Sequence, residues 1–218
     1  VELLKYHRQP VAAQARARGL SVALMPMVRL AHAQDRGHWR GVIRPRDPEA
    51  WWRSYRRFVA HYAELAARSG VSLLAIGTEL SSMSADRYRT RWHRVARAAR
   101  ARFDGPLAYV ANHDALDLRA PFEAVDVVGV SAYFPLADDL EAPERELRAA
   151  WRRHAGRLER LGRATGKPVV LFEVGYPSVD GGAMRPWDYT TGAPIDLEEQ
   201  RAAYAAFAAA TSEARWLE

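Results

Sequence analysis

The sequence predicts an α/β protein of the (β/α)8 TIM-barrel type. Short apolar runs alternate with amphipathic helical segments, and 49% of the 218 residues are hydrophobic while 27% are charged. Strands that are apolar throughout and alternate with helices indicate a parallel sheet covered on both faces. An open doubly wound sheet shares this pattern, but no GxGxxG or P-loop motif follows any strand. Polar and aromatic residues follow successive strands instead, as they do at the active-site end of a barrel.

The spacing of apolar residues, and glycines that end helices, predict the individual helices and strands. Gly19 and Gly70 each follow a helical pattern in the position of a C-terminal cap. Periodic apolar residues predict helices over residues 11–18, 48–69, 86–102, 144–165 and 197–210. Apolar runs predict strands within residues 21–30, 71–76, 107–111, 125–130 and 169–172.

The number of predicted strands is too small for a complete barrel. A complete barrel of this type has eight strands and about 250 residues. The sequence yields five strands and opens on a helix. We therefore expect a single catalytic domain over residues 1–218 that forms an incomplete barrel, with two strands missing before Val1 and one after Glu218.

Charge and composition exclude several classes of function. The formal charge is +6, and thirty of the 32 basic residues are arginine. The densest basic stripe has helical spacing, which favours a solvated helix face over an anionic partner. It consists of Arg91, Arg94, Arg97 and Arg100. No nucleic-acid-binding motif accompanies it, so no nucleic-acid partner is expected. No apolar run approaches the roughly 18 residues of a membrane span, and the absence of cysteine excludes disulfides and thiolate zinc sites.

Two glutamates directly follow predicted strands. Glu79 comes after the strand ending near Ile76, and Glu173 comes after the strand over 169–172. A carboxylate next to a buried strand is costly unless it is paired or used. An ion pair with a neighbouring arginine is one explanation for each. The other is a pair of glutamates at one barrel mouth, one an acid/base and one a nucleophile, as glycoside hydrolysis requires.

The loops after the strands contain further candidates for sugar binding. Aromatic rings stack on the apolar faces of sugars, and five aromatic residues lie in these loops: Trp39, Tyr133, Tyr176, Trp187 and Tyr189. Asn112, His113 and Asp114 offer hydrogen bonds to hydroxyl groups. For each aromatic residue the alternative is core packing. The histidines lack metal-ligand spacing, and Ser131 lacks the second glycine of a nucleophile elbow. No metal or other cofactor is expected.

The loop segments resemble glycoside hydrolase family 113, the TIM-barrel β-mannanases of a retaining clan that uses two glutamates. The similarity runs through nearly the whole chain. The matching segments are LMPMVRL (24–30), WRG (39–41), residues 51–62, IGTEL (76–80), YVANHD (109–114), VGVSAYFPL (128–136), KPVVLFEVGYP (167–177) and PWDY (186–189).

The resemblance implies a role for each matching residue. It implies that Glu79, after the fourth barrel strand, is the general acid/base and that Glu173, after the seventh, is the nucleophile. The five strands are then the third to the seventh. Tyr133 would hydrogen-bond the nucleophile or the adjacent sugar, and Trp39 and Trp187 would line sugar subsites. The sequence departs from the family at His113, where many relatives have tryptophan, and at Met27, where some have histidine.

Together these observations predict a retaining glycoside hydrolase for β-1,4-linked, mannose-containing glycans. Its substrate would be an oligo- or polysaccharide, bound by Trp39, Asn112, Asp114, Tyr133, Tyr176 and Trp187. The protein is expected to be a monomer without membrane insertion, and a secreted or cell-envelope location in a bacterium is favoured over the cytoplasm. The alternative is an inactive or differently specific carbohydrate-binding relative.

Overall fold

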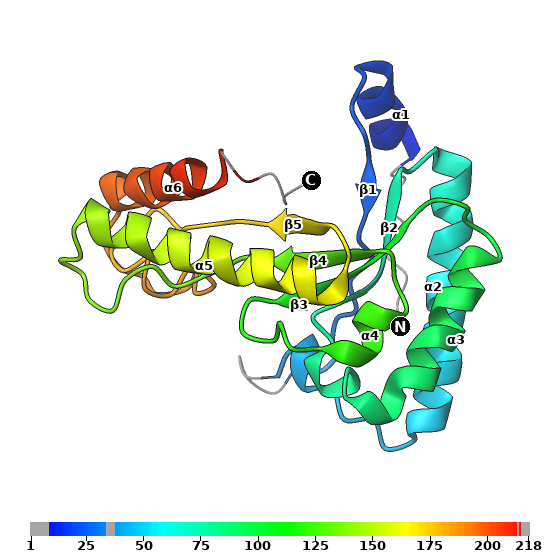
Figure 1. Cartoon of the computed structure of the whole chain (residues 1–218). Helices are drawn as coiled ribbons and strands as arrows, with labels where there is room; N and C mark the ends of the chain where they lie inside the picture. Colours follow the sequence, from blue (N-terminus) through cyan, green and yellow to red (C-terminus); the bar gives the residue numbers. More distant parts are fainter. Residues whose placement is uncertain (1–8, 34–37, 213, 215–218) are drawn as a thin grey trace. The chain divides into compact units, whose positions relative to one another are not determined.

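The computed structural model describes residues 9–33, 38–212 and 214 (Figure 1). The helices are α1 (Gln9–Ala17), α2 (Pro48–Ser69), α3 (Arg89–Arg100), α4 (Arg119–Glu123), α5 (Glu144–Thr165) and α6 (Leu197–Thr211). Short 3-10 turns lie at η1 (Arg40–Val42), η2 (Ser81–Met83) and η3 (Asp86–Tyr88). The strands are β1 (Ala23–Leu24), β2 (Leu73–Thr78), β3 (Leu107–Asn112), β4 (Val127–Ser131) and β5 (Val169–Glu173).

The five described strands form one sheet in the order of the sequence, β1-β2-β3-β4-β5. The pairs β1–β2 and β2–β3 are parallel. Ala75 pairs with Ala108 and Thr78 with Val110, so β2 carries one residue more than β3 between these positions. Such a bulge bends a strand and redirects the side chains beyond it. Here it lies just before Glu79.

Most elements lie where the sequence predicts them. Helix α5 has the predicted bounds, and α2 is capped as predicted by Gly70, whose φ is +63°. The first strand differs most, because β1 has only two residues, one exposed and one half-buried, instead of a long buried run. The short helix α4 was not predicted. Its five residues are too few to show a helical period.

The chain divides into two compact units, and the prediction of a single domain stays a prediction. The first unit comprises Val1–Ala111 with Asp117–Gly129. Within it, α2 and α3 lie side by side (Figure 1). The Trp92 ring lies 5.4 Å from that of Trp52 and 5.0 Å from that of Tyr109, all edge-on and buried. These aromatic rings pack against the end of β2, at Gly77.

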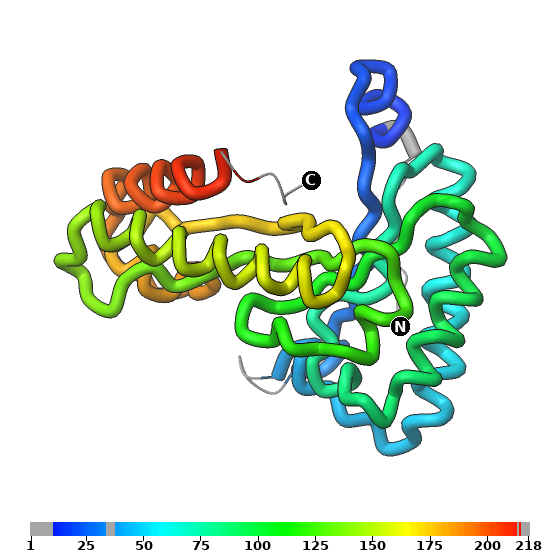
Figure 2. The backbone as a smooth tube through the Cα atoms, in the orientation of Figure 1, coloured from blue at the N-terminus to red at the C-terminus, as the bar shows by residue number. Residues whose placement is uncertain are grey.

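The second unit comprises Asn112–Leu116 with Val130–Glu218. Its helices α5 and α6 pack together, and the ring of Trp151 on α5 lies 5.0 Å from that of Phe207 on α6. A long loop leads from β5 to α6 (Figure 2). Glu199 holds this loop by accepting hydrogen bonds from the backbone N–H groups of Gly181 and Ala183.

No helix in the described part of the chain is both long enough and apolar enough to cross a membrane.

Candidate active site

Glu79, which directly follows β2, has an unusual backbone conformation. Its φ is +52°, and it is the one non-glycine residue with positive φ in the described part of the chain. Such a conformation costs roughly 1–3 kcal/mol and tends to occur at functional sites. Before it, Gly77 leaves no room for a side chain, since a Cβ would lie 2.7 Å from the Trp92 ring and 2.8 Å from that of Tyr109. The bulge, the glycine and the strained residue together redirect the chain as it leaves the sheet.

The Glu79 carboxylate contacts an arginine that the sequence analysis did not single out. The Arg40 Nη2 atom lies 2.6 Å from Glu79 Oε2, and 22% of the arginine side chain but only 6% of the glutamate side chain is exposed. This is the ion pair that the sequence left open as an alternative to catalysis. The position of Arg40 directly after Trp39, in a loop that follows a strand, was the signal that could have identified it.

Glu173 ends β5 and contacts a tyrosine. The Tyr133 hydroxyl donates a 2.7 Å hydrogen bond to Glu173 Oε2, and both residues are half-buried. The backbone N–H of Ala132 donates to the Glu173 carbonyl, which sets the register of the two segments. Gly175 makes room for the tyrosine, because a Cβ there would lie 2.9 Å from Tyr133 Cε1. The sequence paired these two residues only through the family resemblance.

Asn112, His113 and Asp114 form a short polar turn in the second unit. The Asn112 amide donates to Asp114 at 2.9 Å, and its oxygen lies 3.2 Å from His113 Nδ1. The imidazole of His113 is stacked on Trp187, with ring centroids 5.0 Å apart and an interplanar angle of 17°. Trp187 keeps 47% of its surface exposed. His113 therefore supports an exposed indole face.

The other predicted aromatic residues differ in exposure. The Trp39 ring lies half-buried against Gly41, with the Arg40 guanidinium 6.0 Å from its centroid. Tyr176 is only 3% exposed, and its hydroxyl donates to the Phe134 carbonyl, which favours core packing over sugar binding. Tyr189 is 86% exposed.

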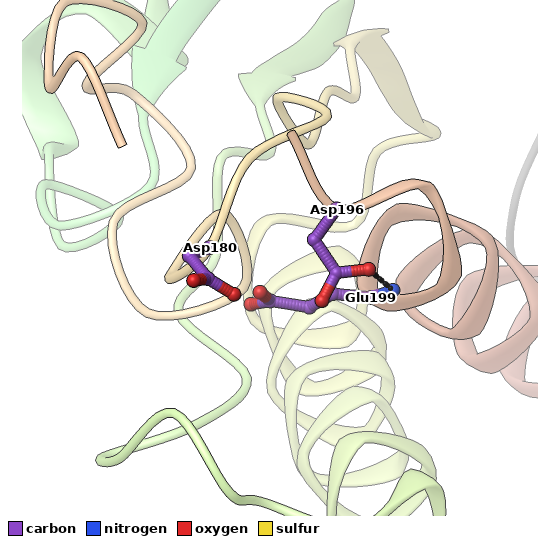
Figure 3. A group of neighbouring side chains, drawn as sticks. All are labelled: Asp180, Asp196 and Glu199. Atoms are coloured by element: carbon purple, nitrogen blue, oxygen red, sulfur yellow. Dashed lines mark hydrogen bonds between the residues drawn. The ribbon is translucent and has the colours of Figure 1, made fainter. Parts of the chain in front are cut away.

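Asp126 and one cluster of acidic residues have structural explanations. Asp126 accepts hydrogen bonds from Arg100 at 2.8 Å and from the Leu107 backbone N–H at 2.9 Å, so it joins α3 to the sheet. Asp180, Asp196 and Glu199 lie close enough to hold a cation (Figure 3). Asp196, however, caps α6 by accepting from the Glu199 N–H, and Glu199 binds loop N–H groups. Neither group requires a metal.

Two half-buried histidines, His113 and His154, predict acid sensitivity of the fold. Burial lowers the pKa of His113, against the opposite effect of Asp114, and burial also lowers the pKa of His154. Arg157 lowers both pKa values further, and Arg153 lowers that of His154. The unfolded chain therefore binds protons at a higher pH than the folded protein, so the free energy of unfolding falls as the pH drops below about 6.5.

Urea denaturation between pH 7.5 and pH 5 measures this effect. The double variant His113→Gln, His154→Gln is expected to lose stability less steeply over that interval than the wild type. An equally steep loss in the variant would assign the acid sensitivity to other groups.

Comparison with known proteins assigns the family. The family model for Glycoside Hydrolase Family 113 matches residues 8–218, so the chain belongs to this family. The β-mannanase AaManA from Alicyclobacillus acidocaldarius, solved in complex with ManMIm, is similar with 31% identity and a TM-score of 0.81. The match covers 96% of this chain and 64% of that structure. A search of curated proteins found no match.

More distant structures share the fold. A β-1,4-mannanase of the same family matches with 24% identity and a TM-score of 0.81, covering 96% of this chain and 64% of its own. A β-glucuronidase from an uncultured Clostridium species matches with 15% identity and a TM-score of 0.68, covering 99% of this chain and 35% of its own. The predicted TIM-barrel type is confirmed, and the chain spans 64% of the length of the mannanases.

Proposed function

We propose that the protein is a retaining glycoside hydrolase that cleaves β-1,4-linked, mannose-containing glycans. Glu79 serves as general acid/base and Glu173 as nucleophile, and no cofactor takes part. The observation that carries the proposal is the presence of these two glutamates at the ends of β2 and β5 in a chain that belongs to Glycoside Hydrolase Family 113. The similar structures of β-mannanases support mannose as the sugar.

The surroundings of Glu173 suit a nucleophile. Its carboxylate accepts one hydrogen bond from the neutral Tyr133 hydroxyl at 2.7 Å. A neutral donor orients the carboxylate and leaves it free to form the bond to the anomeric carbon. When that bond forms, the glycosyl ester loses its charge, and a hydroxyl tolerates this loss better than a cation would. Tyr133 therefore positions Glu173 for attack without competing for its charge.

Glu79 has the contacts of a group held in one place. The Arg40 ion pair at 2.6 Å and the strained backbone leave this side chain little freedom. In the first step Glu79 gives a proton to the leaving oxygen, and in the second it accepts one from the attacking water. Both steps gain from a carboxyl group that does not have to be oriented during the reaction.

Sugar binding is assigned to Trp187, Trp39, Asn112 and Asp114. The exposed indole of Trp187, backed by His113, offers a flat apolar surface of the kind on which a pyranose ring stacks. The polar turn beside it supplies an amide and a carboxylate for hydroxyl groups. Tyr176 is left out of this set because it is buried.

Hydrolysis of β-1,4-mannohexaose tests the proposal, with cellohexaose as the control. The chain is expected to release shorter manno-oligosaccharides, and proton NMR of the first product should show the β-anomer. An α-anomer as the first product would establish inversion and contradict the assigned nucleophile. Failure to cleave mannohexaose would overturn the proposed hydrolase function.

A carbohydrate-binding protein without turnover is the second candidate. The observation that favours it is the Arg40–Glu79 ion pair, which is also a purely structural way to bury a glutamate. Calorimetric titration separates the two functions. Binding of mannohexaose without any released product, together with unchanged affinity in Glu79→Gln and Glu173→Gln, would establish the binding function.

A further inference from the structure

We propose that Tyr109 and Ser84 are positioning residues for Glu79, holding in place the peptide that follows it. The inference rests on the proposed function, in which Glu79 is the acid/base. Both residues bond to the backbone of Leu80, and they act on Glu79 through that backbone.

Three hydrogen bonds close a buried ring around Leu80. The Leu80 N–H donates to the Tyr109 hydroxyl at 3.1 Å. The Ser84 hydroxyl donates to the Leu80 carbonyl at 2.8 Å. The two hydroxyl oxygens lie 2.7 Å apart. Tyr109 is fully buried and Ser84 is 1% exposed, so water does not compete for these bonds.

The direction of the third bond follows from the other two. A serine hydroxyl has one hydrogen, and that of Ser84 goes to the Leu80 carbonyl. Tyr109 must therefore donate to Ser84 Oγ while it accepts from the Leu80 N–H. Burial raises the pKa of the Tyr109 hydroxyl, so the phenol keeps the proton that this bond needs. Every bond in the ring then points the same way, an arrangement in which each strengthens the next.

The ring opposes relaxation of the strained residue. Glu79 has a φ of +52°, and its own N–H donates to the Val110 carbonyl at 2.8 Å. Return of Glu79 to an ordinary conformation would have to turn the peptide between Glu79 and Leu80. That turn would remove the Leu80 N–H from Tyr109. Two adjacent residues of β3 thus hold the peptides on both sides of Glu79. The Val110 carbonyl holds the peptide before it, and the Tyr109 side chain holds the peptide after it.

The turn beyond Leu80 is held by further contacts. Trp92 Nε1 donates to the Met83 carbonyl at 3.0 Å, and the Ser82 hydroxyl donates to the Ile43 carbonyl at 2.8 Å. These bonds anchor the η2 turn to α3 and to the segment after Arg40. The ring around Leu80 is the part of this network next to Glu79, which is why its loss should affect the carboxyl group first.

Tyr109→Phe tests the inference, and Tyr55→Phe is a matched control. The Tyr55 hydroxyl is also buried and donates to β2, at the Ile76 carbonyl 2.8 Å away, rather than bonding to the Leu80 peptide. With mannohexaose, Tyr109→Phe should lower kcat by about 10- to 100-fold with little change in KM, because a small displacement of the proposed acid/base has an effect of this size. Tyr55→Phe should reduce stability without lowering kcat in this way.

Amide hydrogen exchange of Leu80 provides a readout that does not depend on turnover. Faster exchange of this amide is expected in Tyr109→Phe and unchanged exchange in Tyr55→Phe. Ser84→Ala, a smaller change, should accelerate exchange less than Tyr109→Phe, because the Tyr109 oxygen remains as acceptor.

The outcomes separate the two proposals. Unchanged kcat or unchanged Leu80 exchange in both Tyr109→Phe and Ser84→Ala would overturn the positioning role. An equal loss of kcat in Tyr55→Phe would also overturn it, since the effect would then reflect general destabilisation. A wild-type chain that does not cleave mannohexaose would overturn the proposed function. The exchange rate of the Leu80 amide would then decide alone whether Tyr109 and Ser84 hold the peptide between Glu79 and Leu80.

Discussion

Glu173→Gly is expected to abolish hydrolysis of mannosides, and added azide should restore consumption of an activated aryl β-mannoside with an α-mannosyl azide as the product. Removal of the nucleophile leaves space in which azide attacks the anomeric carbon directly, with one inversion. Loss of turnover should exceed the roughly 10²–10⁴-fold contribution of general acid–base catalysis, because the covalent intermediate is lost altogether. NMR of the azide product assigns its anomeric configuration.

Glu79→Gly is the matched variant, and its product should have the opposite configuration. In the proposed mechanism Glu173 still forms the glycosyl–enzyme intermediate from an activated substrate, and azide opens it with a second inversion, which gives the β-mannosyl azide. Glycine also tolerates the positive φ of residue 79, so this variant keeps the local backbone. Exchanged configurations would reverse the two roles, and failure of azide to act on either variant would contradict the assigned mechanism.

The sequence predicted the elements whose signals are local. Helix α5 carries its apolar period over 22 residues, and Gly70, predicted as a helix cap, adopts the left-handed conformation. Glu79 and Glu173 were singled out because each follows an apolar strand, a position visible in the chain itself. Trp187 was singled out as an aromatic residue in a loop, and the roles of all three stay predictions.

The missed features depend on contacts between distant residues. Arg40 and Glu79 are 39 positions apart, so the place of Arg40 after Trp39 in a post-strand loop could single out the arginine but not its pairing with Glu79. Tyr109 lies within an apolar strand and looks like an ordinary core residue until its hydroxyl is placed against Leu80. Tyr176 is a tyrosine in a loop that was expected to bind sugar, and its burial, which the sequence did not indicate, favours core packing. Its hydroxyl finds a backbone partner, which makes that burial inexpensive.

Trp92 connects the aromatic core of the first unit to the backbone around Glu79. Its ring is fully buried against Trp52, Tyr55 and Tyr109, and it lies where a side chain at Gly77 would otherwise fit. The same ring therefore supports the bulge in β2 and the tyrosine behind Leu80. A residue in this position contributes to stability and to the geometry of the site through the same contacts.

Trp92→Ala is accordingly expected to lower the free energy of unfolding by about 3–5 kcal/mol, the cost of removing a large buried aromatic side chain. Trp92→Phe should lose less, because it retains an aromatic ring and forgoes mainly the hydrogen bond to the Met83 carbonyl. Urea denaturation measures both, with Tyr189→Ala as the exposed aromatic control, expected within about 0.5 kcal/mol of the wild type. Equal stability of Trp92→Ala and Tyr189→Ala would show that the aromatic core does not support the first unit. If Trp92→Phe keeps slow exchange at Leu80 while Trp92→Ala loses it, packing against Tyr109 rather than the Met83 hydrogen bond links this core to Glu79.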